Sequence, residues 1–191
     1  MKGVTMFKVN IKDLSQKEKV LFNKLISAAA LIAPLYLKQK NNKYPGANFY
    51  PHDATKEEIE KAAKKNPAIL NPFTFVERNK SDKLVAVPYH LKFKQELKQV
   101  AKLLLEAASL NQNQNFKAYL QAQAKSLLTD KYDFSNILWL KTENSKISCV
   151  IGPYDRYLDR LFFQKRAYMA WVGILDVKQT KEAEKLKLTI L

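Results

Sequence analysis

Apolar residues recur at three- and four-residue steps near the start of the chain, a spacing typical of the buried face of an α-helix. The recurring positions are Leu21, Leu25, Ala28, Ile32 and Leu35. Ser15 and Glu18 precede this run in the S-x-x-E order of a capping box, in which each side chain bonds the backbone N–H of the other residue. We therefore predict a core helix that begins after Ser15 and bends at Pro34.

The same helix raises the alternative of a membrane anchor or an export signal, because residues 25–37 are almost wholly apolar. A stretch of 13 residues is too short to span a bilayer. It also begins late for a signal peptide, and Pro34 interrupts it. A core helix accounts for these features better, so we expect no membrane association. The single cysteine, Cys149, fits a reducing compartment, and we expect a cytoplasmic location.

Further along, the pattern changes between helical and strand-like periods. Thr55 and Glu58 repeat the capping-box order, and Asn66-Pro67 ends the helix that follows, because a residue before proline avoids the helical conformation. The stretch FTFVERNKSDKLVAVPY predicts a β-hairpin with its turn at residues 79–82. A long helix is predicted from His90, and NQNQN separates it from a second helix.

Two later runs, KISCVIGPY and AYMAWVGIL, read as strands, and the lysine-rich end KQTKEAEKLKLTIL reads as an amphipathic tail helix. The predicted order is two helices, two strands, two helices, two strands and a helix. This order favours an α+β fold in which helices pack on a small, mainly antiparallel sheet or partial barrel. No linker divides the chain, so residues 1–191 are expected to form a single domain.

The net charge of +15 suggests a nucleic-acid partner. Only four of the 33 basic residues are arginine, however, and arginine supplies the planar group that grips phosphate and guanine at two points. The lysines are also spread along the whole chain. We favour a solvated lysine-rich surface, with at most weak and non-specific binding of nucleic acid.

Residues for common catalytic chemistry are scarce. The two histidines, His52 and His90, lie 38 positions apart, and Cys149 has no partner cysteine, so the chain offers no recognisable zinc motif. We expect His52 to lie in an aromatic loop, His90 to form a hydrogen bond at a strand end and Cys149 to be a packed thiol. With four glycines there is no phosphate-binding loop, and there is no Nudix-type box. No cofactor is expected for this chain alone.

One stretch carries an unusual concentration of functional groups. Residues 154–160 contain two tyrosines, two aspartates and two of the four arginines. If the strand continued through them, alternation would place Asp155 and Tyr157 on one face and Tyr154 and Arg156 on the other. A carboxylate beside a phenol can bind a substrate ammonium and donate to a developing oxyanion. The alternative is an edge strand whose polar side chains keep it soluble.

The segment IGPYDRYLDRLFFQKRAYMAWVGILD resembles a segment of the dipeptidyl-peptidase III family that reads approximately I-G-x-x-E-x-Y-x-D-x-x-F, and it is most similar to the shorter bacterial and plant relatives. Further pieces are similar in the same order, so the resemblance extends from about residue 14 to residue 176. These pieces are LYLKQK, NFYPHDATKEEIEKA, LVAVPYH, AKLLLEAASL and YLQAQAKSLLTDKYDFSNILWL.

The resemblance implies an N-terminal, substrate-binding part of a two-lobed zinc exopeptidase that removes dipeptides from peptide N-termini. In that family, residues at the positions of Asp155 and Tyr157 hold the substrate amino group and hydrogen-bond the scissile carbonyl region. The family's zinc motif, H-E-x-x-G-H or a close variant, lies downstream of this segment and is absent here. Zinc is thus expected only from a further lobe.

Three departures from the family pattern weaken the expectation of full activity. Asp155 replaces a glutamate, Phe163 stands where the relatives usually have glycine, and Met169 stands where they usually have glutamate. We therefore predict a fragment or degenerate relative of the peptidase that contributes part of the peptide-binding cleft, is inactive alone and has a peptide or a missing zinc lobe as partner. The alternative is a non-catalytic basic domain that binds a protein or a polyanion.

Overall fold

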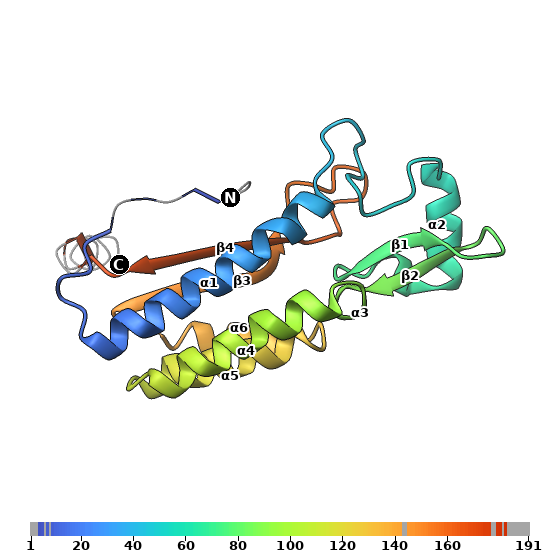
Figure 1. Ribbon diagram of the computed structural model, residues 1–191. Helices are drawn as coiled ribbons and strands as arrows, with labels where there is room; N and C mark the ends of the chain where they lie inside the picture. Colours follow the sequence, from blue (N-terminus) through green and yellow to red (C-terminus); the bar gives the residue numbers. More distant parts are fainter. Residues whose placement is uncertain are drawn as a thin grey trace, which may run out of the picture.

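The computed structural model describes residues 4, 5, 7, 9–142, 145–176, 179, 180 and 182. Within them the chain forms helices and short antiparallel strands (Figure 1), which confirms the α+β prediction. The tail helix predicted at the C-terminal end falls largely outside the described residues. In order, the elements are α1 (Gln16–Gln39), α2 (Lys56–Lys65), the 3-10 helix η1 (Pro67–Leu70), β1 (Thr74–Arg78), β2 (Leu84–Pro88), α3 (Tyr89–Lys92), α4 (Lys94–Leu110), α5 (Gln114–Leu127), α6 (Asp133–Trp139), β3 (Ile147–Asp155) and β4 (Ala167–Ile174).

The four strands form two separate antiparallel pairs, β1 with β2 and β3 with β4, and not the one small sheet or partial barrel that the sequence predicted. Figure 1 shows β3 and β4 running along α1, while β1 and β2 lie at one end of the helices, beside α2. Helix α1 packs on α4, and α4 packs on α5. The helices, and not a continuous sheet, therefore join the two strand pairs.

Helix α1 begins as the sequence predicted. The Ser15 side chain accepts from the Glu18 N–H at 3.3 Å, and the Glu18 carboxylate accepts from the Ser15 N–H at 2.7 Å. All five apolar positions of the predicted face are buried. By length and composition α1 would also pass for a membrane span. Because its apolar face packs against α4 and β4, we assign it to the core.

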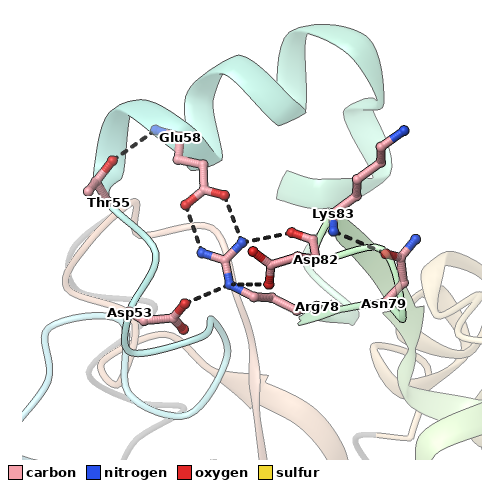
Figure 2. A network of polar contacts seen from close by, with 7 residues as sticks. All are labelled: Asp53, Thr55, Glu58, Arg78, Asn79, Asp82 and Lys83. Atoms are coloured by element: carbon pink, nitrogen blue, oxygen red, sulfur yellow. Dashed lines mark hydrogen bonds and ion pairs between the residues drawn. The ribbon is translucent and has the colours of Figure 1, made fainter.

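The second predicted capping box is only half formed. Thr55 accepts from the Glu58 N–H at 3.1 Å, but the Glu58 carboxylate turns to Arg78 instead of the cap. Figure 2 shows the Arg78 guanidinium between two carboxylates. Its Nη1 and Nη2 donate to the two Glu58 oxygens at 2.8 and 2.9 Å. Its Nε donates to the Asp53 carboxylate at 2.6 Å. These bonds raise the pKa of Arg78 and lower the pKa of both carboxyls. The network ties α2 to the β1–β2 hairpin.

An aromatic cluster joins that hairpin to the helices and to β4. The Phe75 ring lies 5.0 Å from Tyr89 and 5.5 Å from Phe93, and the Tyr168 ring lies 5.7 and 5.8 Å from the same two residues. All four side chains are buried, so large apolar surfaces from β1, α3, α4 and β4 meet at one point. This cluster fixes where β4 begins, and with it the loop that precedes β4.

Helix α5 covers the free edge of β3. Tyr119 donates to the Cys149 carbonyl at 3.2 Å, and the Gln123 amide donates to the Ile151 carbonyl at 2.6 Å. These carbonyls point away from β4 and would otherwise be left unpaired at a strand edge. The next helix, α6, was missed by the sequence interpretation because seven residues are too few for a helical period to stand out.

A candidate functional site where β3 ends

Strand β3 ends at Asp155, so the alternation considered for residues 154–157 does not extend to Tyr157. The register of β3 against β4 shifts between Pro153 and Asp155. Oδ1 of Asp155 accepts from the Tyr157 N–H, two residues further on, at 2.7 Å. This bond closes an Asx turn. The two candidate residues are therefore joined by a turn, and not by the face of a continuous strand.

The side chains around this turn differ sharply in exposure. The Tyr154 hydroxyl donates to the Gln123 side chain at 3.1 Å, so this tyrosine points toward the helices. Asp155 is half-buried, and its charge adds to burial in raising the pKa of Tyr36 at the end of α1. Tyr157 is 86% exposed. A carboxylate and a free phenol thus lie within three residues of each other on an accessible turn.

Asp159, four residues beyond Asp155, has the opposite environment, with no exposed surface. Its carboxylate accepts from the Tyr50 hydroxyl at 3.1 Å. It also accepts four backbone N–H groups of the same loop, at 3.0 to 3.1 Å, from Leu161, Phe162, Gln164 and Lys165. One buried carboxylate therefore folds residues 159–165 around itself.

Lys165 anchors the other end of this loop to the region before β1. It is 1% exposed, and its ammonium donates to the Ile69 and Asn71 carbonyls at 2.6 and 2.9 Å and to the Thr74 hydroxyl at 2.8 Å. Three acceptors use all three protons of a charged lysine. Burial opposes that charge and lowers the pKa of Lys165 to about 7, while the charge of Asp159 acts in the other direction.

The sequence interpretation missed both Asp159 and Lys165. Their partners Tyr50 and Ile69 are 109 and 96 residues away along the chain, and no local motif announces such contacts. Two signals pointed to Asp159: it is the second aspartate of the tyrosine- and arginine-rich stretch, and the family pattern I-G-x-x-E-x-Y-x-D carries an aspartate at its position. The structure identifies it as a loop-building residue. Its role is to fold the loop that follows Tyr157.

Phe163 takes the backbone conformation that glycine favours. Its φ is 57°, in the left-handed region that costs a residue with a Cβ about 1–2 kcal/mol. The ring is 70% exposed, so burial recovers little of that cost. The departure from glycine that the sequence showed at this position therefore has a physical consequence: the loop keeps the shape that glycine allows while carrying a phenylalanine.

The residues that might have held a metal lie apart. His90 follows β2 and bonds Asp130 through Nδ1 at 2.7 Å, and His52 contacts the Tyr44 ring at 5.0 Å in the aromatic loop, as predicted for both. Cys149 is buried, which raises the pKa of its thiol to about 12 and confirms a packed thiol. In the described part of the chain no three His, Cys, Asp or Glu residues are grouped to bind a metal ion, so this donor set does not fit zinc.

Two solved structures are similar to this chain along almost its whole length. The structure of dipeptidyl-peptidase III from Caldithrix abyssi matches with a TM-score of 0.89 and 27% identity, covering 95% of this chain and 44% of that one. Dipeptidyl-peptidase III from Corallococcus sp. strain EGB matches with a TM-score of 0.86 and 28% identity, covering 94% of this chain and 43% of that one. No protein-family profile matches the sequence.

Among curated proteins, Nudix hydrolase 3 of Arabidopsis thaliana is 27% identical over 73% of this chain, a region that makes up 21% of the plant protein. The chain thus spans less than half of the two bacterial structures and about a fifth of the plant protein. The chain is thus similar to part of dipeptidyl-peptidase III over almost its whole length. More narrowly, the chain corresponds to an N-terminal part of that protein, which confirms the resemblance seen in the sequence.

Proposed function

We propose that this chain forms part of the peptide-binding cleft of a dipeptidyl-peptidase III-like peptidase and has no peptidase activity alone. The observation that carries the proposal is the turn at the end of β3, where Asp155 and an 86% exposed Tyr157 stand on a loop held by a buried carboxylate and a buried lysine. Similarity to dipeptidyl-peptidase III across 95% of the chain supports it.

In this proposal, Asp155 binds the free amino group of a peptide. An ammonium and a carboxylate form a charge-assisted hydrogen bond, which is about twice as strong as a neutral one. Oδ1 of Asp155 already accepts from the Tyr157 N–H, so the amino group would be received by the other oxygen. The turn would thus fix the direction in which the carboxylate meets the peptide.

Tyr157 supplies the second contact, a phenol O–H that donates to the carbonyl oxygen of the bond to be cleaved. Such a donor stabilises the negative charge that develops on that oxygen in the transition state. The loop that Asp159 builds holds the backbone beside Tyr157, so the phenol can be presented without being packed. The described residues do not fit a metal, so the metal-binding residues would come from another part of such an enzyme.

A fusion tests this function independently of any binding between separate parts. The chain is joined to the portion of the Caldithrix abyssi protein that it does not match, and dipeptide release from a chromogenic peptide is measured. We expect activity, and we expect Tyr157→Phe to lower kcat by about 10²-fold, the scale for losing one oxyanion donor. Arg156→Lys, the exposed neighbour, is the matched control and should retain the activity.

Thermal unfolding of each fusion separates a functional loss from a folding defect. An inactive fusion that is folded and loaded with zinc would contradict the proposal, as would equal kcat values for the Tyr157→Phe and Arg156→Lys proteins. Unfolding of the Tyr157→Phe protein at a much lower temperature would instead identify Tyr157 as a packing residue, which also contradicts the proposal.

A further inference from the structure

An apolar hollow of about 380 Å³ lies between α6 and the face of β3 that points away from α1. Its lining includes Ile137 and Trp139 from α6, Leu140 directly after that helix, and Val150 from β3. Several of these side chains are unusually open for their type: Leu140 is 65% exposed, Ile137 is 54% exposed and Trp139 is 37% exposed. An exposed group of large apolar residues marks a surface for a partner.

Trp171 extends this surface across the strand pair. It lies opposite Val150 in the register of β3 and β4, and residues directly opposite each other in an antiparallel pair share a face. Trp171 is 42% exposed, so a second large ring continues the apolar area beyond the hollow. We call the area formed by Ile137, Trp139, Leu140, Val150 and Trp171 the α6–β4 surface.

The charge of the α6–β4 surface differs from that of the chain as a whole. The chain carries 33 basic residues and a net charge of +15. None of the residues that line the hollow is charged: these are Tyr119, Asn136, Ile137, Trp139, Leu140, Val150 and Tyr154. A lysine-rich protein that leaves such an area uncharged favours an apolar polypeptide as occupant over a polyanion.

The outer edge of β4 is closed at Tyr168, whose N–H donates to the Gln39 side chain of α1 at 2.7 Å, and is open further along the strand. Leu175 donates to the Lys146 carbonyl at 2.8 Å, which sets the alternation of bonded and non-bonded pairs between β3 and β4. The N–H and C=O groups of Ala170 and Val172 consequently point away from β3. Among the described residues no other segment hydrogen-bonds them. An open strand edge accepts a further strand.

We infer that the α6–β4 surface and the open edge of β4 bind the part of a dipeptidyl-peptidase III-like protein that this chain does not contain, whether that part is joined to the chain or separate. This inference rests on the proposed function and adds to it the surface of assembly. The occupant follows from the lengths: the chain covers 44% and 43% of the two similar structures, so more than half of each lies outside the matched region.

The tryptophans make this inference directly testable, because Trp139 and Trp171 are the only two in the sequence and both belong to the α6–β4 surface. The remaining portion of the Caldithrix abyssi protein is co-expressed with the unlabelled chain and then separated from it. It is mixed with the full chain labelled with fluorotryptophan. Fluorine NMR gives one resonance for each ring, assigned with Trp139→Phe and Trp171→Phe. We expect both resonances to shift and to lose their sensitivity to D₂O on binding.

Two variants locate the contact. Leu140→Lys places a charge on the surface, and Val172→Pro removes an N–H that points away from β3 without breaking the β3–β4 pairing. Each should weaken binding at least about tenfold, the scale for losing one central interface contact. Leu105→Lys on α4, where the side chain is 49% exposed on a different face, is the matched control and should bind like the original chain.

The outcomes separate this inference from the proposed function. Binding that leaves both resonances unchanged and is equally strong in the Leu140→Lys protein overturns the inference, and so does the absence of any complex. The chain could instead associate with itself, lose that association in the Leu140→Lys protein and not bind the bacterial portion. This result would make a second copy of the chain the occupant and would also overturn the inference. The fusion joins the two parts covalently, so an active and Tyr157-dependent fusion would leave the proposed function standing in each case.

Discussion

Two aspartates four residues apart show how differently this chain uses the same side chain. Asp159 has no exposed surface and accepts five hydrogen bonds, four from backbone N–H groups and one from Tyr50. Asp155 is half-buried and accepts a backbone hydrogen bond from the Tyr157 N–H. The first carboxylate is saturated by the fold, whereas the second keeps an oxygen available.

The contrast teaches that one charged stretch can contain a residue that stabilises the fold beside a residue that is able to bind a ligand. A saturated buried carboxylate has no capacity left for a ligand, so its substitution should act on stability. A carboxylate with spare acceptor capacity beside an exposed phenol lowers the free energy of unfolding little, and it can bind a substrate ammonium. Each half of the loop can therefore be tested with a different measurement.

The largest effect is expected at Asp159. Asp159→Asn keeps the size of the side chain but turns an amide NH₂ group toward N–H donors that now lack an acceptor. Breaking a buried charged network from one side costs about 3–5 kcal/mol. Urea unfolding at neutral pH, followed by circular dichroism, should show a loss of that order. A loss below about 1 kcal/mol would mean that the loop does not depend on this carboxylate.

A pH-dependent gain of stability is expected from Lys165. Its pKa is lowered from 10.5 to about 7 in the folded chain. Between these values the unfolded chain binds a proton that the folded chain does not, so stability rises with pH across this window. The penalty is fully present below pH 7 and disappears as the pH approaches 10.5. At about 1.4 kcal/mol for each pKa unit, the rise amounts to a few kcal/mol.

Urea unfolding of the original chain and of Lys165→Met between pH 6 and about pH 10 measures this effect. We expect a rising stability for the original chain and a flatter curve for Lys165→Met, which cannot titrate. Parallel curves for the two proteins would show that other groups cause the pH dependence and that Lys165 keeps an ordinary affinity for its proton.

A smaller gain is expected at Phe163. Phe163→Gly removes the strain of a φ of 57° at a side chain that is 70% exposed, and should stabilise the chain by about 1 kcal/mol. Phe163→Ala is the control, because it removes the ring and keeps the strained Cβ. Differential scanning calorimetry should rank the glycine protein above the alanine protein. Equal stability of the two would show that the backbone strain is not what matters here.

The smallest effect is expected at Tyr157 in the isolated chain. An exposed side chain with no special role changes stability by less than about 0.5 kcal/mol when it is altered, and Tyr157 is 86% exposed. Tyr157→Phe should therefore unfold in urea at the same midpoint as the original chain. A clear loss of stability would place the phenol within the packing of the loop.

Much of the fold could be predicted because its signals are local. The Ser15–Glu18 box, the buried face of α1 and the β1–β2 hairpin each depend on residues within a few positions of one another. The end of β3 was predicted to within one residue, at Tyr154. Only the alternation considered beyond it fails, because an Asx turn at Asp155 replaces the strand there and alternation of side-chain types cannot reveal such a turn.

The rest depends on contacts that are distant in sequence. Nothing near Lys165 indicates that its ammonium bonds the Ile69 carbonyl, or that Glu58 leaves its helix cap for Arg78. The division of the strands into two pairs has a similar origin, because α5 occupies the edge of β3 where another strand would add. The site residues Asp155 and Tyr157 came from the family resemblance, and their roles remain a prediction.

The most direct test of the central claim compares Asp155→Asn and Asp159→Asn in the fusion with the remaining portion of the Caldithrix abyssi protein. Both kcat/KM for a peptide with a free amino terminus and the thermal unfolding temperature are measured. The account predicts that Asp155→Asn lowers kcat/KM at least about tenfold, the worth of one charge-assisted bond, at an unchanged unfolding temperature, while Asp159→Asn lowers the unfolding temperature markedly. An Asp155→Asn protein with full kcat/KM, or one that unfolds as early as Asp159→Asn, would contradict it.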